Sequence, residues 1–366
     1  MPRTPHVRAR DADASHVIRA LVVDDSAVLR RLISNVLASD PEIEVVGTAV
    51  DGLDAIEKVD VLKPDVVTLD VEMPRLDGLG AVKEISARHP RLPVIMFSTL
   101  TEKGASATLH ALSNGASDYV AKPTGATSFA DALDIVRDEL LPRVKALTAA
   151  RRISAGAPAA VPRPRATPPV RTQPEVLVIA CSTGGPDALS KVLAGLPATF
   201  ALPVLVTQHM PPVFTAQFAD RLDRVSPLSV REASDGDVVR RGDVLVAPGD
   251  FHLRVSRSAG VVRAALDQGP RENFCRPAAD PLLRSAAELY GPGVLCLVLT
   301  GMGSDGLEGA RVVVDKGGRV VVQDQATSVV WGMPGAVAGA GLAHEVLPLE
   351  AIAPRLSVLA GALPVG

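Results

Sequence analysis

The chain has 366 residues, of which 47% are hydrophobic and 22% charged, and its formal net charge is −3. This length predicts two domains. The small net charge and the low aromatic content of 3% argue against a protein whose main partner is a nucleic acid or a membrane surface. Cys181, Cys275 and Cys296 match no zinc or disulfide spacing, which favours a reducing, cytoplasmic location.

The chain is expected to divide into a tail, two domains and a linker. Residues 1–16 mix Arg, Pro and Asp and lack the apolar core of a signal peptide, so we expect a flexible tail. No apolar run reaches the ~20 residues that span a bilayer, so direct membrane insertion is not expected. Residues 151–174 hold six prolines and no acidic residue, which predicts a Pro/Ala/Arg-rich linker over 140–174. A basic patch for an acidic partner is the alternative. The domains then occupy 17–139 and 175–366.

Apolar runs alternate with amphipathic stretches through the first domain. Strands that are almost continuous Val, Ile and Leu are typical of a parallel sheet covered by helices on both faces. The pattern therefore predicts a doubly wound, five-stranded α/β domain. The expected strands are residues 17–25, 42–49, 65–71, 93–99 and 116–123, and the expected helices are residues 26–40, 54–63, 80–90, 102–116 and a stretch from about Phe129.

Polar residues follow four of these strands. In a parallel α/β sheet, the carboxyl ends of the strands form the ligand site. Asp24-Asp25, Asp70, Ser98 and Lys122 stand at these ends. Carboxylates in one crevice repel one another and favour Mg²⁺, and a lysine opposite can hold an anionic oxygen. These groups can make and read an aspartyl phosphate. Helix capping by the aspartates alone is the structural alternative.

Residues 17–139 contain four motifs in a characteristic order: LVVDDS, LDVEMPRLDG, the hydroxyl after VIMF, and YVAKP. This part of the chain resembles the receiver domain of bacterial response regulators, which is flavodoxin- and CheY-like in fold. The resemblance implies that Asp70 accepts phosphate from a histidine kinase. It implies a Mg²⁺ site made of Asp24, Asp25, Asp70 and the backbone carbonyl of Glu72. It also implies that the phosphoryl group is sensed by Ser98, Tyr119 and Lys122.

The second domain resumes the parallel pattern with strands at 176–182, 203–210 and 293–301. Residues 228–266 differ, because apolar and polar residues alternate there between Gly-Asp and Ser-Ala-Gly turns, as they do in hairpins. We therefore expect a parallel α/β domain with an antiparallel hairpin insertion.

Ser182, His209 and Asp305 follow three of the parallel strands, so they can meet at one edge of the sheet. An imidazole can take the proton of a serine hydroxyl, and a buried carboxylate can hold that imidazole. Taken singly, each of the three residues is typical of a turn or a cap. Cys181 is a rival nucleophile, and the hairpin region holds rival partners in Asp250 and His252.

Five further motifs extend the resemblance over the second domain: ACSTGGP, TQHMPP, NFCRPAADPLLRSAA, LTGMGSDG and DQATSVVWGMPGAVA. From about Val176 to Leu347, the chain resembles the catalytic domain of the CheB family of chemotaxis protein-glutamate methylesterases. The resemblance implies that Ser182 is the nucleophile, His209 the base and Asp305 its orienter. It also implies an oxyanion site made by backbone groups of Thr183 and Met302, and a substrate cleft lined by Arg276.

The implied activity is that of a phosphorylation-activated response regulator. Such a protein hydrolyses glutamate γ-methyl esters on methyl-accepting chemoreceptors, releases methanol, and deamidates receptor glutamines by the same acyl transfer. Mg²⁺ is implied for receiver phosphorylation, and no cofactor for the esterase step. The sequence departs from the family at Ala180-Cys181, where Gly-Ala is commoner, and at Cys275, where many members have His. A binding module that no longer turns over remains an alternative. A transcription factor is a third interpretation. The acidic net charge and the lack of a recognition helix argue against it, so no DNA partner is expected.

Overall fold

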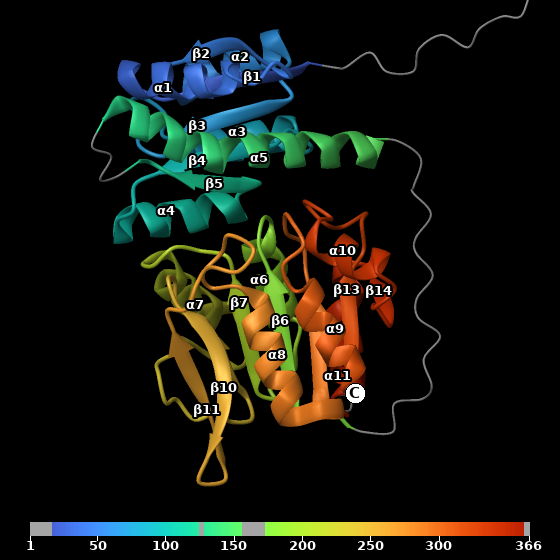
Figure 1. Cartoon of the computed structure of the whole chain (residues 1–366). Helices are drawn as coiled ribbons and strands as arrows, with labels where there is room; N and C mark the ends of the chain where they lie inside the picture. Colours follow the sequence, from blue (N-terminus) through green and yellow to red (C-terminus); the bar gives the residue numbers. More distant parts are fainter. Residues whose placement is uncertain (1–16, 124–127, 156–172, 362–366) are drawn as a thin grey trace, which may run out of the picture.

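Two α/β domains make up the described residues, 17–123, 128–155 and 173–361, of the computed structural model (Figure 1). The first domain lies above the second in this view, and its strand β5 (Asp118–Ala121) and helix α4 (Glu102–Ser113) lie nearest to the second domain. The expected tail and residues 156–172 of the expected linker lie outside the described residues. No helix among the described residues is long and apolar enough to cross a bilayer.

The first domain is a sheet of five parallel strands, as predicted, and their order is β2-β1-β3-β4-β5. Strands β3 and β4 are wholly buried, because helices cover both faces of the sheet. The other four strands are β1 (Ile18–Val23), β2 (Ile43–Ala49), β3 (Val66–Asp70) and β4 (Val94–Ser98). The strand order reverses between β1 and β3, which places a crevice at the carboxyl ends of these two strands.

Side-chain caps set the starts of several helices in this domain. Ser26, Asp77 and Thr101 each accept a hydrogen bond from a backbone N–H in the first turn of the helix that follows. The helices of the first domain, besides α4, are α1 (Ala27–Ala38), α2 (Gly52–Leu62), α3 (Gly78–Arg88) and α5 (Phe129–Ala155).

Helix α5 runs further than the sequence indicated. It continues through Pro142 to Ala155, so residues 140–155 of the expected linker are helical, while the domain boundaries stay a prediction. One face of the helix is buried against the first domain at helical spacing, and it consists of Val136, Leu140, Val144 and Leu147. The continuous packing of this face explains why the helix continues past residue 140, where the linker was expected to begin, and why it tolerates Pro142.

The second domain contains a sheet of seven parallel strands, in the order β14-β13-β12-β6-β7-β9-β8, and a separate antiparallel hairpin, β10-β11. This confirms the predicted fold class. The strands are β6 (Val176–Cys181), β7 (Val204–Gln208), β8 (Ser229–Glu232), β9 (Asp243–Val246), β10 (His252–Ser258), β11 (Val261–Asp267), β12 (Val294–Val298), β13 (Arg319–Gln323) and β14 (Glu345–Leu347). The helices are α6 (Gly185–Ala194), α7 (Phe214–Val225), α8 (Ala279–Tyr290), α9 (Leu307–Asp315), α10 (Met333–Gly339) and α11 (Leu349–Leu359), with a short 3₁₀ turn, η1 (Gly291–Gly293).

The antiparallel insertion is smaller than the range 228–266 predicted. β8 and β9 lie in that range, but they extend the main sheet beside β7 with parallel pairing. Residues 233–242 form a connection long enough to bring β9 back parallel to β8, which a short hairpin turn cannot do. β8 is the edge strand and is half-exposed, so it keeps the alternating pattern that suggested a hairpin.

Candidate functional site

The carboxyl ends of β1, β3 and β5 bring together the acidic residues and the lysine of the first domain. Asp24, Asp25 and Asp70 each place a carboxylate oxygen within 4.8 Å of the others. The ammonium group of Lys122 lies 2.6 Å from Asp70 Oδ1 and 3.6 Å from Asp24 Oδ2. The arrangement is typical of the Mg²⁺ site of a receiver domain.

Burial and mutual repulsion raise the pKa of the two inner carboxyl groups. For Asp24, burial followed by the charge of Asp70 raises the pKa to about 6, against the pull of Lys122. Burial also raises the pKa of Asp70, although Lys122 and the N–H of Val71 stabilise its charged form. Asp24 Oδ2 and Asp70 Oδ2 are buried and accept no hydrogen bond from the described residues. These two oxygens, which lack a hydrogen-bond donor, fit a divalent cation.

The remaining residues implied for this site are Ser98 and Tyr119, for phosphoryl sensing, and Glu72, for the Mg²⁺ site through its backbone carbonyl. Ser98 ends β4, and its buried hydroxyl donates to the Gly104 carbonyl at 3.0 Å. The side chain of Glu72 pairs with Lys103 at 2.8 Å, so its carboxylate is engaged outside the acidic group. Tyr119 is buried in β5, where its ring faces the second domain.

In the second domain, β6 and β7 end side by side and present Ser182 and His209. The register pairs Cys181 with Gln208, and the His209 N–H donates to the Cys181 carbonyl at 3.2 Å. Ser182 is half-buried. Its N–H donates to the Thr300 carbonyl at 3.1 Å, and the Ser182 carbonyl accepts from the Gly185 N–H at 2.7 Å. Within the described residues, no hydrogen bond joins the Ser182 hydroxyl to His209.

Asp305 holds one nitrogen of the His209 ring. The distance from His209 Nε2 to Asp305 Oδ2 is 2.7 Å, and the Asp305 side chain is almost wholly buried. Backbone N–H groups of Ala279 at 2.6 Å and Gly306 at 3.0 Å also donate to this carboxylate. Although burial raises the pKa of Asp305, these donors and His209 lower it overall, so the charged carboxylate is favoured.

The other ring nitrogen faces a residue whose role the sequence left open. Cys275 Sγ lies 3.5 Å from His209 Nδ1. Burial by itself lowers the pKa of His209, but the hydrogen bonds with Asp305 and Cys275 outweigh it and raise the pKa to about 10. A carboxylate and a sulfur thus flank the two ring nitrogens of His209.

The turn after Ser182 depends on glycine. Gly184 has φ +77, and a Cβ there would lie 2.6 Å from the side chain of Val329. The sharp turn leads directly into α6, whose N-terminal N–H groups can stabilise an anion. Thr183 is buried, and Met302 is half-buried. Their expected roles at an oxyanion site stay predictions.

The rivals named from the sequence are engaged elsewhere. The Cys181 thiol is fully buried and points to the Thr207 carbonyl at 3.7 Å, and burial raises its pKa. His252 is buried between the Pro270 carbonyl at 2.9 Å and the Ala278 N–H at 3.3 Å. Both groups therefore form hydrogen bonds that do not involve Ser182.

A cleft of about 460 Å³ opens between the two domains and reaches His209 and Cys275. Arg276 lines it, held by Asp250 at 2.6 Å and by the carbonyls of Gln268 and Gly269. Asp250 is therefore the partner of Arg276 and not of His209. The first domain supplies the facing wall of the cleft, which includes Leu100, Tyr119, Lys122, Ile135 and Arg143.

The individual contacts by which the two domains dock are what the sequence analysis did not predict. Thr183 Oγ1 donates to Asp118 Oδ2 at 2.6 Å, and Arg143 Nε lies 3.3 Å from the same oxygen. The rings of Tyr119 and Phe214 stack with centroids 4.8 Å apart and an interplanar angle of 6°. Residues from both domains belong to one buried apolar cluster. No local pattern signals contacts that exist only once two domains dock.

Helix α4 of the first domain packs on α7 of the second. Arg221 Nη1 donates to the Leu109 carbonyl at 3.3 Å, and its other terminal nitrogen donates to the Ser113 hydroxyl. The face of the first domain formed by α4 and β5 therefore covers the strand ends that carry Ser182 and His209 (Figure 1).

Known proteins match this architecture over nearly its whole length. Residues 20–134 match the response regulator receiver domain, and residues 177–356 match the CheB methylesterase. The chain is 55% identical over 347 residues to a protein-glutamate methylesterase/protein-glutamine glutaminase of Nocardioides sp. (strain ATCC BAA-499 / JS614), which covers 93% of this chain and 94% of the relative. It is 45% identical to the protein of the same name from Trichodesmium erythraeum (strain IMS101), over 92% of this chain and 97% of that one.

The second domain also matches a solved structure. The crystal structure of the Thermotoga maritima CheB methylesterase catalytic domain is 45% identical, with a TM-score of 0.50, and covers 51% of this chain and 100% of that chain. Because the matched family consists of enzymes, the alternatives of a binding module and a transcription factor are set aside. The chain therefore belongs to the CheB family of protein-glutamate methylesterases/protein-glutamine glutaminases, with an N-terminal receiver domain and a C-terminal methylesterase domain.

Proposed function

We propose that this methylesterase uses Ser182, His209 and Asp305 on glutamate γ-methyl esters of chemoreceptors, and that its receiver domain restrains the reaction until Asp70 is phosphorylated. The observation that carries the proposal is the hydrogen bond of 2.7 Å between His209 and Asp305, at the sheet edge that also presents Ser182 and lies under the receiver domain.

The chemistry follows from the positions of three groups. Asp305 occupies Nε2 of His209, so Nδ1 is the nitrogen that accepts the Ser182 proton. The Ser182 oxygen then attacks the ester carbonyl, methanol leaves, and water releases the glutamate carboxylate from the acyl-enzyme. Asp305 stabilises the imidazolium that forms. A catalytic hydrogen bond is often loose in a resting enzyme and tightens when substrate binds, which accommodates the position of the Ser182 hydroxyl. Glutamine deamidation follows the same route, with ammonia as the leaving group.

The acidic residues of the receiver domain fit a Mg²⁺ ion. Asp24 and Asp70 keep buried carboxylate oxygens that accept no hydrogen bond from the described residues, and Asp25 adds an exposed one. When bound, Mg²⁺ would neutralise charge on a phosphoryl group transferred to Asp70. Lys122, at 2.6 Å from Asp70, then holds a phosphoryl oxygen. A histidine kinase is the expected phosphodonor.

The test of the function uses receptors as the substrate. Membranes that carry methylated chemoreceptors should release methanol when the full chain, Mg²⁺ and a small phosphodonor are added. Membranes whose receptor glutamates were never methylated provide the control. Release of equal methanol from both membranes, or none from either, would contradict the proposed substrate.

The contact between Asp118 and Thr183 supports restraint by the receiver domain. Thr183 is adjacent to Ser182, and its hydroxyl is bound by a buried receiver carboxylate. A hydrogen bond to a charged group is worth about 1.5–3 kcal/mol. Ser182 follows β6 at the sheet edge that the receiver domain covers, so release of this contact would open the site.

Removing the restraint is expected to raise the resting activity. A fragment of residues 175–366 should hydrolyse receptor esters about 5–150-fold faster than the unphosphorylated full chain, the range that couplings of this kind usually span. In the full chain, Asp118→Ala should recover part of this gain, whereas Asp118→Asn keeps a hydrogen-bond acceptor and should recover less. The measurement is methanol release without phosphodonor. Equal resting rates for fragment and full chain would contradict restraint by occlusion.

A further inference from the structure

Cys275 lies against the nitrogen of His209 that Asp305 leaves free. The sulfur is 3.5 Å from Nδ1, and Asp305 is 2.7 Å from Nε2 on the opposite side of the ring. A thiol, an imidazole and a carboxylate therefore stand in line. This is the order of groups by which hydrolases with a Cys-His pair generate a thiolate.

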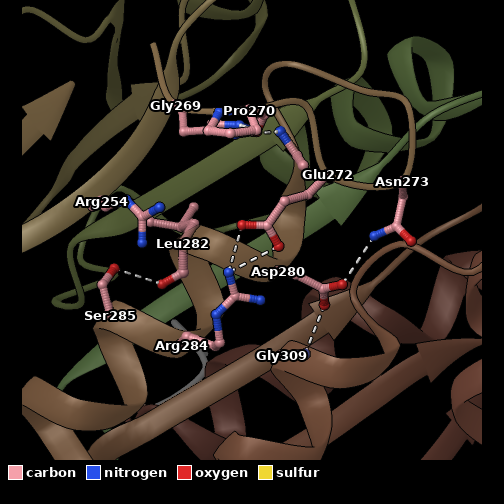
Figure 2. Close-up of polar contacts among 12 residues, drawn as sticks. Arg254, Gly269, Pro270, Glu272, Asn273, Asp280, Leu282, Arg284, Ser285 and Gly309 are labelled. Carbon is pink, nitrogen blue, oxygen red and sulfur yellow. Dashed lines mark hydrogen bonds and ion pairs between the residues drawn. The ribbon is translucent and has the colours of Figure 1, made fainter. Parts of the chain in front are cut away.

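Glu272 and Asn273, in the loop that precedes Cys275, contact α8, which in turn contacts α9 (Figure 2). Glu272 forms two hydrogen bonds with Arg284, at 2.6 and 2.8 Å. Asn273 donates to Asp280 at 3.0 Å, and Asp280 in turn accepts from the Gly309 N–H at 2.6 Å.

Two further contacts fix this loop beside the His209–Asp305 pair. Asn273 also donates to Asp305 at 2.9 Å, which ties the loop to the carboxylate that holds His209. Cys275 and Glu272 exchange backbone hydrogen bonds at 2.9 and 3.2 Å. The position of the thiol beside His209 is thus built into the loop.

The two other thiols provide a contrast within the same chain. Cys181 and Cys296 lie inside strands, are 0% exposed, and have pKa values raised by burial. Cys275 is half-buried and lines the interdomain cleft together with His209. Only Cys275 combines access for a small reagent with a base at hydrogen-bond distance.

We propose that Cys275 is an activated thiol and a site of covalent modification by alkylating electrophiles and peroxides. Its proton passes to His209 Nδ1, and the thiolate is the nucleophile. With iodoacetamide, the sulfur bonds to the methylene carbon and iodide leaves. With hydrogen peroxide, the sulfur bonds to one oxygen, the O–O bond breaks, and the departing hydroxide takes the proton from His209 as water. The sulfur is oxidised by two electrons to a sulfenic acid, and the peroxide is reduced.

Modification of Cys275 should also stop ester hydrolysis. Nδ1 is the only ring nitrogen that Asp305 leaves for the Ser182 proton, and Cys275 already competes for it. A carbamidomethyl group or a sulfenic oxygen on the sulfur fills the space beside Nδ1 within the cleft. The reactivity of the thiol depends on His209 and Asp305 and not on Ser182, so its test is independent of the proposed esterase mechanism.

The first experiment measures the rate at which each cysteine of the folded full chain is alkylated by iodoacetamide, by mass spectrometry of its peptides. Cys275 should react at least about tenfold faster than Cys181 and Cys296, since the thiolate is the reactive form. His209→Gln should slow the labelling of Cys275 by about tenfold. The matched control is His89→Gln, which removes a histidine that pairs with Asp60 at 2.8 Å in the receiver domain and should change nothing.

Because His209→Gln could disturb the fold, Asp305→Asn serves as a second variant, and thermal melting is recorded for each protein. Asp305→Asn should also slow the labelling of Cys275. If Cys275 reacts no faster than the two buried cysteines, or reacts as fast in both folded variants as in the unchanged chain, the activated thiol is refuted.

The second experiment compares each protein with itself before and after treatment. Loss of methanol release should follow the labelling of Cys275 in time. Dimedone should trap a sulfenic acid at Cys275 after peroxide treatment. Cys275→Ala should retain the same fraction of its own untreated rate whether or not reagent is added. If methanol release persists with Cys275 fully labelled, or if Cys275→Ala is inhibited to the same fraction, the inhibitory role is refuted.

Discussion

Replacing Ser182 with alanine is expected to lower methanol release by about 10⁴-fold or more, since removal of the nucleophile of a triad has effects of this size or larger. Alanine lacks the oxygen that forms the acyl-enzyme, while the backbone contacts of this turn, from Ser182 N–H to Thr300 and from Gly185 N–H to Ser182, do not depend on the side chain. The variant should therefore melt at the same temperature as the unchanged chain. Receptor membranes and a phosphodonor supply the assay.

Cys181→Ala is the matched control for this prediction. The thiol of Cys181 precedes Ser182 directly, but it is fully buried and faces Thr207 on the neighbouring strand. Its loss should leave most of the activity. The reverse pattern, in which Cys181→Ala is inactive and Ser182→Ala is active, would make the thiol the nucleophile.

The residual activity of Ser182→Ala should not respond to iodoacetamide as the full activity does, because it no longer depends on His209 as the base.

Strand ends were the part of both sites that the sequence could predict. Asp24, Asp70 and Lys122 each follow a run of buried apolar residues, and the parallel order of β1, β3 and β5 puts them at one edge. The same argument placed Ser182 and His209 side by side on β6 and β7. A buried parallel strand has a clear local pattern, so the position of the residue after it is predictable.

The parts that could not be predicted depend on contacts between distant segments. Asp118 meets Thr183 only because two domains dock, and nothing in the residues around either one signals it. Cys275 reaches His209 through a loop whose path includes positive φ angles at Asn273 and Phe274, 51° and 64°. Asparagine is enriched in this conformation but phenylalanine is not, so the residue types do not predict the path of the loop. The parallel pairing of β8 with β9 likewise depends on a long connection and an edge position, whereas alternation alone favoured a hairpin.

Asp70→Asn is expected to abolish phosphorylation of the full chain. An acetyl phosphate donor with Mg²⁺ should label the unchanged chain stoichiometrically and the variant not at all, because an amide has no carboxylate oxygen to attack phosphorus. Asn has the same size and can still contact Lys122, which lies 2.6 Å from Asp70. The matched control is Asp77→Asn, an aspartate of the same loop that caps α3 and should label normally. Stoichiometric labelling of Asp70→Asn would contradict Asp70 as the acceptor.

The same variant separates phosphorylation from the restraint that it relieves. A phosphoryl group adds about −1.5 to −2 charges beside Lys122, at the carboxyl end of β5. The other residues of that short strand include Asp118 and Tyr119, which contact Thr183 and Phe214 in the methylesterase domain. A rearrangement of β5 would therefore change both the surroundings of Asp70 and the contacts with the methylesterase domain. In the presence of donor, Asp70→Asn should stay at the resting rate of the full chain, while the unchanged chain rises toward the rate of the 175–366 fragment. The fragment itself should not respond to donor. If donor activates Asp70→Asn as strongly as the unchanged chain, control of the methylesterase does not pass through this aspartate.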